Sequence, residues 1–223
     1  MSDSLVPYLA ATPFYDFDQP LVQSWVDQVL KDTPEDPVEI AKTLYLAARD
    51  TVNYNPYVFS TDPQTLSASH VLSTRQSYCI PKAVLLGAAA RYKGIPARLG
   101  LADVKNHISS PRLVEYLRSD IFRMHGYIEL YLNGQWVKAT PAFNKRLCLI
   151  MKVEPLAFDG VNDSVFQKFS DDGIQQMEYI NDHGVFSDVP HDFIMTGIRS
   201  AYPHLFDQQA ELQPMSGDLA SEV

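Results

Sequence analysis

Two side chains in this sequence, a cysteine and a histidine, could together perform nucleophilic chemistry. Cys79 lies in the stretch "RQSYCIPKAVLLGAAARYKGIPAR", at the expected start of an alanine-rich helix. The free N–H groups of a helix N-terminus lower the pKa of a thiol and could donate to the oxyanion formed when a carbonyl is attacked. His125 is the candidate partner that such a thiol needs. The alternative is that Cys79 packs at the helix end, as free cysteines often do.

The helix that presents Cys79 is bounded by clear signals. It is predicted to run from about Cys79 to Lys93, with Ser77 as its cap, Pro81 in its first turn and Gly94 after its end. Its many small residues predict that another element approaches it closely. A strand is expected to follow at 97–104.

His125 is placed by the strongest β pattern in the chain, a hairpin over residues 123–142. Apolar and polar residues alternate, and Asn133-Gly134 is typical of a two-residue turn. His125 falls on the polar face. If the two turn residues form the whole loop, the register pairs residues in a fixed way. The pairs are Leu132 with Gln135, Tyr131 with Trp136, Glu129 with Lys138, Tyr127 with Thr140 and His125 with Ala142.

The remaining elements are predicted from periodicity and from capping signals. They are a helix at 21–30, a helix from Thr33-Pro34 to Val52, an irregular connection over 53–77 with a short helix at 65–72, a capped helix within 109–120, a strand at 146–153, loops with short helices over 158–173 and 177–190, and a polar, frayed tail at 208–223.

Composition excludes several functions. The net charge of −9 argues against a nucleic-acid partner, and no apolar run is long enough to span a membrane. The N-terminus lacks the pattern of a signal peptide, so a cytoplasmic location is expected. Two cysteines form no disulfide framework, and no phosphate-loop, dinucleotide or zinc motif is present. No cofactor or metal is expected, and the sequence does not determine the oligomeric state.

The segments "SYCIPKAVLLGAAARYKGIPARLG" and "HGYIELYLNGQWVKAT" resemble the core of the transglutaminase-like superfamily. The resemblance covers about residues 40–145. It implies an α+β fold of papain-like architecture, with N-terminal helices and the nucleophile helix packed on an antiparallel β-sheet. A single domain is expected over residues 1–207, with 146–207 as a family-specific extension.

The resemblance also implies that Cys79 is the nucleophile and His125 its partner. The implied reaction is acyl transfer on an amide through a thioester, ending in hydrolysis, deamidation or cross-linking of a protein, peptide or small amide. Two positions depart from the family pattern. Ser77 stands where glycine is common, and Thr140 stands where the third catalytic residue is usually an aspartate.

Several residues could complete the site. Thr140 holds the aligned third position, and Asn144 is an alternative group to orient the imidazole, since both are diagonal neighbours of His125 in the hairpin register. The Gln76 amide could donate to an oxyanion, or it could be a solvated loop residue. Tyr78 and Trp136 could line the substrate groove, and Tyr127 could pack on the histidine. For Trp136 and Tyr127, packing within the hairpin is the alternative.

The other titratable residues receive structural interpretations. Cys148 is expected to be buried and inert in a strand, and Arg98 to form an ion pair at a strand start. None of the other histidines has metal-ligand spacing; they are His70, His107, His183, His191 and His204. Two alternatives to an enzyme stay open. One is an inactive member of the fold that serves as a binding module, which the missing aspartate would explain; the other is a purely structural domain.

Overall fold

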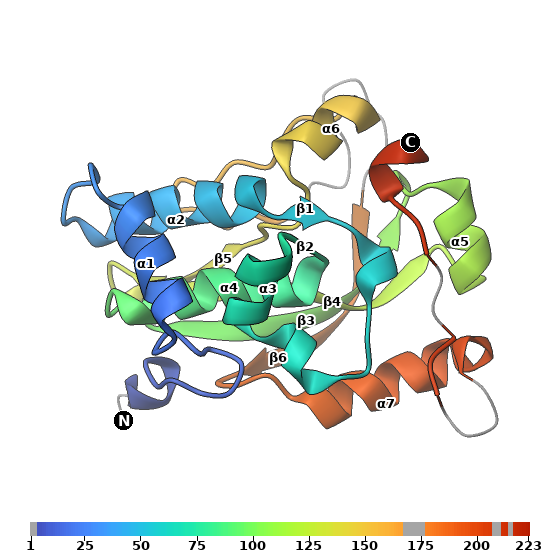
Figure 1. Cartoon of the computed structure of the whole chain (residues 1–223), viewed down its shortest axis with the longest axis horizontal. Helices are drawn as coiled ribbons and strands as arrows, with labels where there is room; N and C mark the ends of the chain where they lie inside the picture. The colour runs from blue at the N-terminus through green and yellow to red at the C-terminus, as the bar shows by residue number, and fades with distance from the viewer. Residues whose placement is uncertain (1–3, 167–176, 207–210, 214–215) are drawn as a thin grey trace.

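The β4–β5 hairpin forms one side of the sheet in the computed structural model, which describes residues 4–166, 177–206, 211–213 and 216–223. Four strands pair antiparallel in the order β5-β4-β3-β6 (Figure 1). Their bounds are β3 Ala97–Asn106, β4 Ile121–Leu132, β5 Gln135–Ala139 and β6 Met177–Phe186. The predicted antiparallel sheet is therefore confirmed.

The predicted hairpin register is also confirmed. Leu132 pairs with Gln135 across the Asn133-Gly134 turn, and the ladder continues to Ile128 and Ala139. It ends there, because Pro141 has no N–H to donate and the chain leaves the sheet. The expected pairs at Thr140 and Ala142 therefore lie beyond the ladder.

Arg98, as expected, forms an ion pair at the start of a strand. Its Nε and Nη2 donate to one carboxylate oxygen of Glu129, at 2.7 and 2.6 Å. Its guanidinium lies 4.0 Å from the centre of the Trp136 ring. Glu129 thus pairs with Arg98 rather than with Lys138, although Lys138 is its partner in the ladder.

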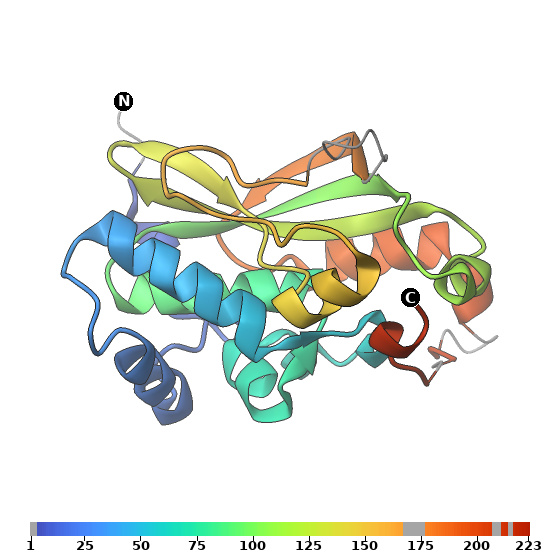
Figure 2. The same ribbon diagram turned by 90° about the horizontal axis from the view of Figure 1, so that it is seen from above.

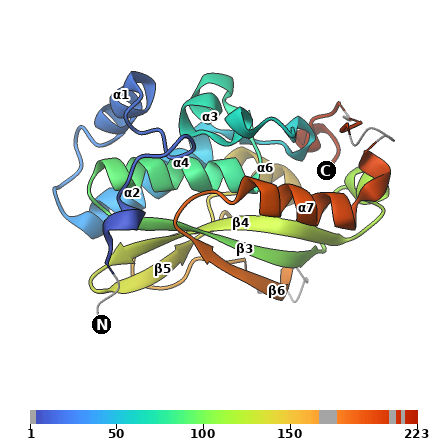
Figure 3. The same cartoon turned by 90° about the horizontal axis from the view of Figure 1, so that it is seen from below.

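The helices gather on one side of the sheet (Figures 2 and 3). α1, α2, α3, α4 and α7 are seen there in both views, and α7 runs along β4. The bounds are α1 Pro20–Val29, α2 Pro37–Thr51, α3 Ala68–Thr74, α4 Cys79–Tyr92, α5 Pro111–Leu117, α6 Lys145–Met151 and α7 His191–Ala201.

Helix α4 is the central helix and is buried almost throughout. It packs on β4 on one side and on α1, α2 and α3 on the other. Its small residues permit this contact, as predicted: a Cβ on Gly87 would lie 2.6 Å from the Tyr15 ring and 2.8 Å from Ile128. The nucleophile candidate at its N-terminus is therefore fixed to the core.

The segment 53–77 before α4 is held by a two-residue parallel pairing. β1 (Asn53–Tyr54) pairs with β2 (Gln76–Ser77). Between them lie α3 and two short 3₁₀ helices, η2 (Pro56–Val58) and η3 (Pro63–Leu66). The other 3₁₀ helices are η1 (Val6–Tyr8), η4 (Pro203–Leu205) and η5 (Leu219–Ser221).

Four local predictions were wrong. Helix α2 starts at Pro37 after an Asp36 cap, a turn later than expected. Tyr78, not Ser77, is the N-cap of α4. The expected strand at 146–153 is helix α6, whose buried Leu147 and Cys148 and half-buried Met151 follow a helical spacing. Residues 177–186, expected to be loop, form β6, whose strand character comes from pairing with β3 along its length.

The described part of the expected tail contacts the body of the protein. Glu222 accepts from Arg112 at 2.7 Å and from Tyr57 at 2.6 Å, and the Ser110 hydroxyl donates to it at 2.8 Å. Residues 167–173, expected to be loop, lie outside the described residues, as do 207–210. The division into a domain over 1–207 and a tail stays a prediction. None of the described helices is long and apolar enough to cross a membrane.

Candidate active site

Cys79 is the first residue of α4, and its sulfur meets a set of backbone donors. The helix has no side-chain cap, so its first N–H groups are not taken by a capping oxygen. The N–H groups of Gly126, Ile80 and Cys79 itself lower the pKa of the thiol. Burial acts the other way and is stronger, so the pKa of Cys79 is raised to about 11.

Gly126 on β4 allows this contact between helix and strand. A Cβ at this position would lie 2.7 Å from the Ile80 Cα and 3.1 Å from the Ile80 backbone nitrogen. Real Cβ atoms do not approach a backbone so closely, so only glycine lets the first turn of α4 touch β4 here. The strand that carries His125 is thereby brought against the helix end that carries Cys79.

His125 is buried on β4, and its Nε2 has no hydrogen-bond partner among the described residues. The ring packs edge-on against Phe166 and Tyr179, with centroid distances of 6.0 and 6.4 Å. Burial lowers the pKa of His125 to about 4, so the isolated ring is neutral at pH 7. A buried, neutral ring nitrogen without a partner is a competent proton acceptor for a group that enters the site.

A β-bulge directly precedes His125. The register between β3 and β4 shifts between Ala102 and Val104, and Met124 has a left-handed backbone with φ of 58°. The buried Asp103 holds this bulge: one carboxylate oxygen accepts from the Met124 N–H at 3.2 Å and the other accepts from Arg123 at 2.8 Å. Bulges of this kind re-aim side chains next to active sites.

His183, from β6, completes the contacts of Asp103. Its Nε2 lies 2.8 Å from an Asp103 carboxylate oxygen. These contacts hold the pKa of Asp103 below its usual range, although burial opposes them. His183 therefore acts on the strand that carries His125 and does not line the cavity described next.

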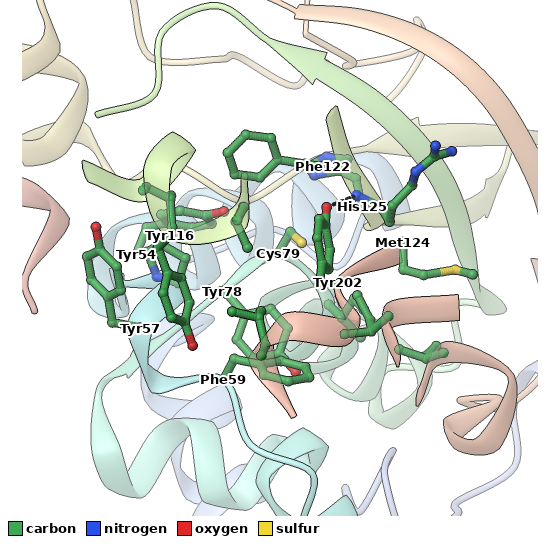
Figure 4. A pocket seen from close by; sticks show the side chains of 18 residues that line it. Tyr54, Tyr57, Phe59, Tyr78, Cys79, Tyr116, Phe122, Met124, His125 and Tyr202 are labelled. Carbon is green, nitrogen blue, oxygen red and sulfur yellow. Dashed lines mark hydrogen bonds between the residues drawn. The ribbon is translucent and has the colours of Figure 1, made fainter. Parts of the chain in front are cut away.

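Cys79 and His125 line one cavity of about 110 Å³. Figure 4 shows both side chains at its wall, surrounded by aromatic side chains that include Tyr54, Phe59, Phe122 and Tyr202. No hydrogen bond joins these two described side chains. Burial disfavours both the thiolate of Cys79 and the imidazolium of His125, so the resting pair is a neutral thiol and a neutral imidazole. The lowered thiol pKa expected from the helix end is therefore outweighed by burial.

The two candidates for the third position have different surroundings. Thr140 is buried, and its Oγ1 has no hydrogen-bond partner among the described residues; the Tyr179 hydroxyl approaches it without reaching that geometry. Tyr179 also packs on the His125 ring. The Asn144 Oδ1 accepts from the Tyr54 N–H at 2.9 Å, so the amide oxygen is already engaged. Neither residue forms a hydrogen bond with His125.

The other predicted site residues fall in different places. Tyr78 is buried and lines the cavity beside Cys79. Gln76 is exposed and lines another cavity, with Asn144. Trp136 packs against Tyr131, Tyr8 and the Arg98 guanidinium and is absent from the Cys79 cavity.

Tyr127 packs away from α4. Its ring covers Gly100 on β3, where a Cβ would lie 2.1 Å from the ring, and the Lys138 ammonium lies 4.9 Å from its centre. For Tyr127 and Trp136 the structure thus shows packing around the hairpin.

Cys148 is buried, as expected, and burial raises its thiol pKa to about 11. Two histidines bind backbone carbonyls: His191 faces the Thr61 carbonyl at 3.2 Å and His204 the Tyr116 carbonyl at 2.8 Å. Within the described residues, no group of three or more His, Cys, Asp or Glu side chains could hold a metal ion.

Sequence reasoning missed Gly126, Tyr179 and the part of α7 that lines the cavity. A glycine inside an alternating strand, directly after the candidate histidine, is a signal for close backbone approach and could have identified Gly126. Tyr179 lies on a strand that local pattern did not predict. Ile194 and Ile198 of α7 reach the cavity only through tertiary packing.

Comparison with known families identifies the class of protein. The sequence model of the Transglutaminase-like superfamily matches residues 23–141, more than half of the chain. The chain belongs to this superfamily. Its members are typically cysteine-dependent enzymes, which agrees with a cysteine and a histidine in one cavity. No curated protein sequence matches the chain significantly.

One of two similar solved structures supports the fold. An arylamine N-acetyltransferase from Salmonella typhimurium matches with a TM-score of 0.50 and 16% identity, over 90% of this chain and 77% of that one. A protein described as a putative cysteine protease from Cytophaga hutchinsonii matches with a TM-score of 0.48 and 16% identity, over 83% of this chain. The chain spans 56% of the length of the latter. At this identity, the likeness to the acetyltransferase shows a shared fold.

Proposed function

We propose that this protein transfers acyl groups from an amide through a thioester on Cys79. The observation that carries the proposal is the position of the Cys79 sulfur. It lies at an uncapped helix N-terminus, against backbone N–H groups, in the cavity that His125 also lines. Donors aimed at a developing negative charge are the main requirement of acyl transfer.

The reaction begins from the neutral pair. As the sulfur attacks the carbonyl carbon, an S–C bond forms and the thiol proton moves to the His125 imidazole. The carbonyl oxygen becomes an oxyanion, which accepts from the Cys79 backbone N–H. Collapse breaks the C–N bond, and the His125 imidazolium gives its proton to the leaving amine.

The second half of the reaction returns the thiol. Water or an amine attacks the thioester while His125 takes its proton, and the proton passes to the departing sulfur. We assign Thr140 to orient the ring, since its hydroxyl is buried and unpartnered among the described residues whereas the Asn144 oxygen is engaged. A threonine cannot stabilise the imidazolium as a carboxylate does, so we expect slower turnover than with an aspartate.

A trapping experiment tests the proposal. Wild-type protein mixed with p-nitrophenyl acetate should release p-nitrophenolate and gain the mass of one acetyl group at Cys79, read by mass spectrometry of the intact protein and its peptides. Cys79→Ser and His125→Ala should abolish or strongly slow this acylation. Cys148→Ala is the matched control, because it removes the other cysteine from a site outside the cavity, and it should be acylated as the wild type is.

The alternative, an inactive fold that serves as a binding module, predicts a different result. Wild type and Cys79→Ser would then release p-nitrophenolate at the same slow rate, and no acetyl group would be found on Cys79. That outcome would overturn the proposed function.

A further inference from the structure

The cavity beside Cys79 has a composition that points to the substrate. Its walls are aromatic and aliphatic side chains from the segment after β1, from α5, from the start of β4 and from α7. Among the described residues that line the cavity, Arg123 is the only one that carries a charge at pH 7, and none is a carboxylate. Arg123 is moreover paired with Asp103. A charged group buried here would lose its hydration and find no free counter-charge, which costs free energy. An apolar group carries no such cost.

The size of the cavity limits what it can hold. At about 110 Å³ it is comparable with an engineered apolar protein cavity of roughly 150 Å³ that binds benzene. One aromatic ring or one branched aliphatic group matches this volume, whereas a fused ring system is larger.

One wall lies outside the segment shared with the family. The family model ends at residue 141, whereas Ile194 and Ile198 of α7 also line the cavity. Ile194 is fully buried and Ile198 partly buried. This chain's own C-terminal segment thus closes the space next to the nucleophile.

We propose that the cavity binds an uncharged, ring-sized apolar group attached to the reacting carbonyl, and that Ile198 on α7 sets the size limit. The inference rests on the proposed function for its role in catalysis. The preferred substrate is then a small acyl compound with an aromatic or branched group, rather than a carboxylate-bearing one.

Alkylation of Cys79 tests the cavity without requiring turnover. The sulfur displaces chloride from an α-chloroketone: an S–C bond forms, a C–Cl bond breaks, and the thiol proton is released. The probes are chloroacetone, phenacyl chloride, its naphthyl analogue and a phenacyl chloride with a ring carboxylate. Each rate is measured by mass spectrometry and divided by the rate with free glutathione, which removes intrinsic reactivity.

The expected order is phenacyl chloride fastest, by about tenfold or more over chloroacetone, since even one methylene in such a pocket changes selectivity by that factor. The naphthyl and carboxylate probes should be slower than phenacyl chloride. Ile198→Ala should accelerate the naphthyl probe, and Ile198→Phe should remove the preference for phenacyl chloride. Leu46→Phe, on an exposed position of α2, should leave all ratios unchanged.

Equal normalised rates for all four probes, or ratios that Ile198 variants leave unchanged, would overturn the inference. The acetylation experiment reports on the proposed function separately. Selective alkylation without acetylation of Cys79 refutes the acyl transfer and leaves the binding specificity standing. Acetylation of Cys79 without selective alkylation refutes the binding specificity and leaves the acyl transfer standing.

Discussion

Gly126→Ala tests the central argument about the site, that the contact between β4 and the first turn of α4 sets the environment of Cys79. The added Cβ would lie 2.7 Å from the Ile80 Cα and 2.8 Å from its Cγ1, so the helix end must move away from the strand. Overpacking of this kind costs about 1–3 kcal/mol of stability. The shift also withdraws the Gly126 N–H from the Cys79 sulfur, which raises the pKa of the thiol further.

The assays separate stability from chemistry. Urea unfolding should show the loss of about 1–3 kcal/mol, and the pH dependence of iodoacetamide labelling should show the upward shift of the Cys79 pKa. Acetylation by p-nitrophenyl acetate should fall by about 100-fold, the effect expected from a displacement near 1 Å.

Gly87→Ala is the matched control for this experiment. Its Cβ would lie 2.6 Å from the Tyr15 ring and 2.8 Å from Ile128, so it overpacks the same helix away from the nucleophile. It should lower stability while leaving the Cys79 pKa and its acetylation unchanged. If the two variants lose the same stability and Gly126→Ala keeps the wild-type thiol pKa and acetylation rate, the reasoning about this contact is refuted.

Three further predictions concern other parts of the structure. Asp103→Asn should lower the free energy of unfolding at pH 7. Folding lowers the pKa of Asp103, so the stability that this carboxylate contributes is present above pH ~3.8 and is lost as the pH falls through the folded pKa. Equal acid unfolding curves for wild type and variant would contradict this prediction. Burial lowers the pKa of Lys82 to about 7. Between pH 7 and 10 the lysine is protonated in the unfolded state and neutral in the folded state, so the stability of wild type relative to Lys82→Met should rise over this range. Urea titrations that give the same difference in stability at every pH would disprove this. Thr140→Val should slow acetylation without a large loss of stability. Asn144→Ala should chiefly lower the urea midpoint, since the Asn144 amide oxygen accepts a hydrogen bond from the Tyr54 N–H. The reverse pattern would assign the orienting role to Asn144.

The strongest local signals of the sequence translated directly into structure. The Asn133-Gly134 turn and the alternation around it fixed the register of β4 and β5, because a two-residue loop permits only one pairing. The helix from Cys79 and the close approach to it followed from its small residues and from Gly94. Segments with mixed signals were harder to interpret: β6 and α6 were predicted as loop and strand, since their structures depend on neighbours that local pattern does not contain.

The sequence by itself indicated the family, through two segments that resemble it. It also determined the helix end that carries Cys79 and the strand that carries His125, because these depend on backbone periodicity and turn chemistry. Only the tertiary structure decided the state of the two groups. Burial raises the thiol pKa and lowers that of the imidazole, and burial is a sum over residues far apart in the chain. The tertiary structure also decided that Tyr179 lies beside Thr140 and that α7 lines the cavity, because these elements contact the site only when the sheet and the helices pack together.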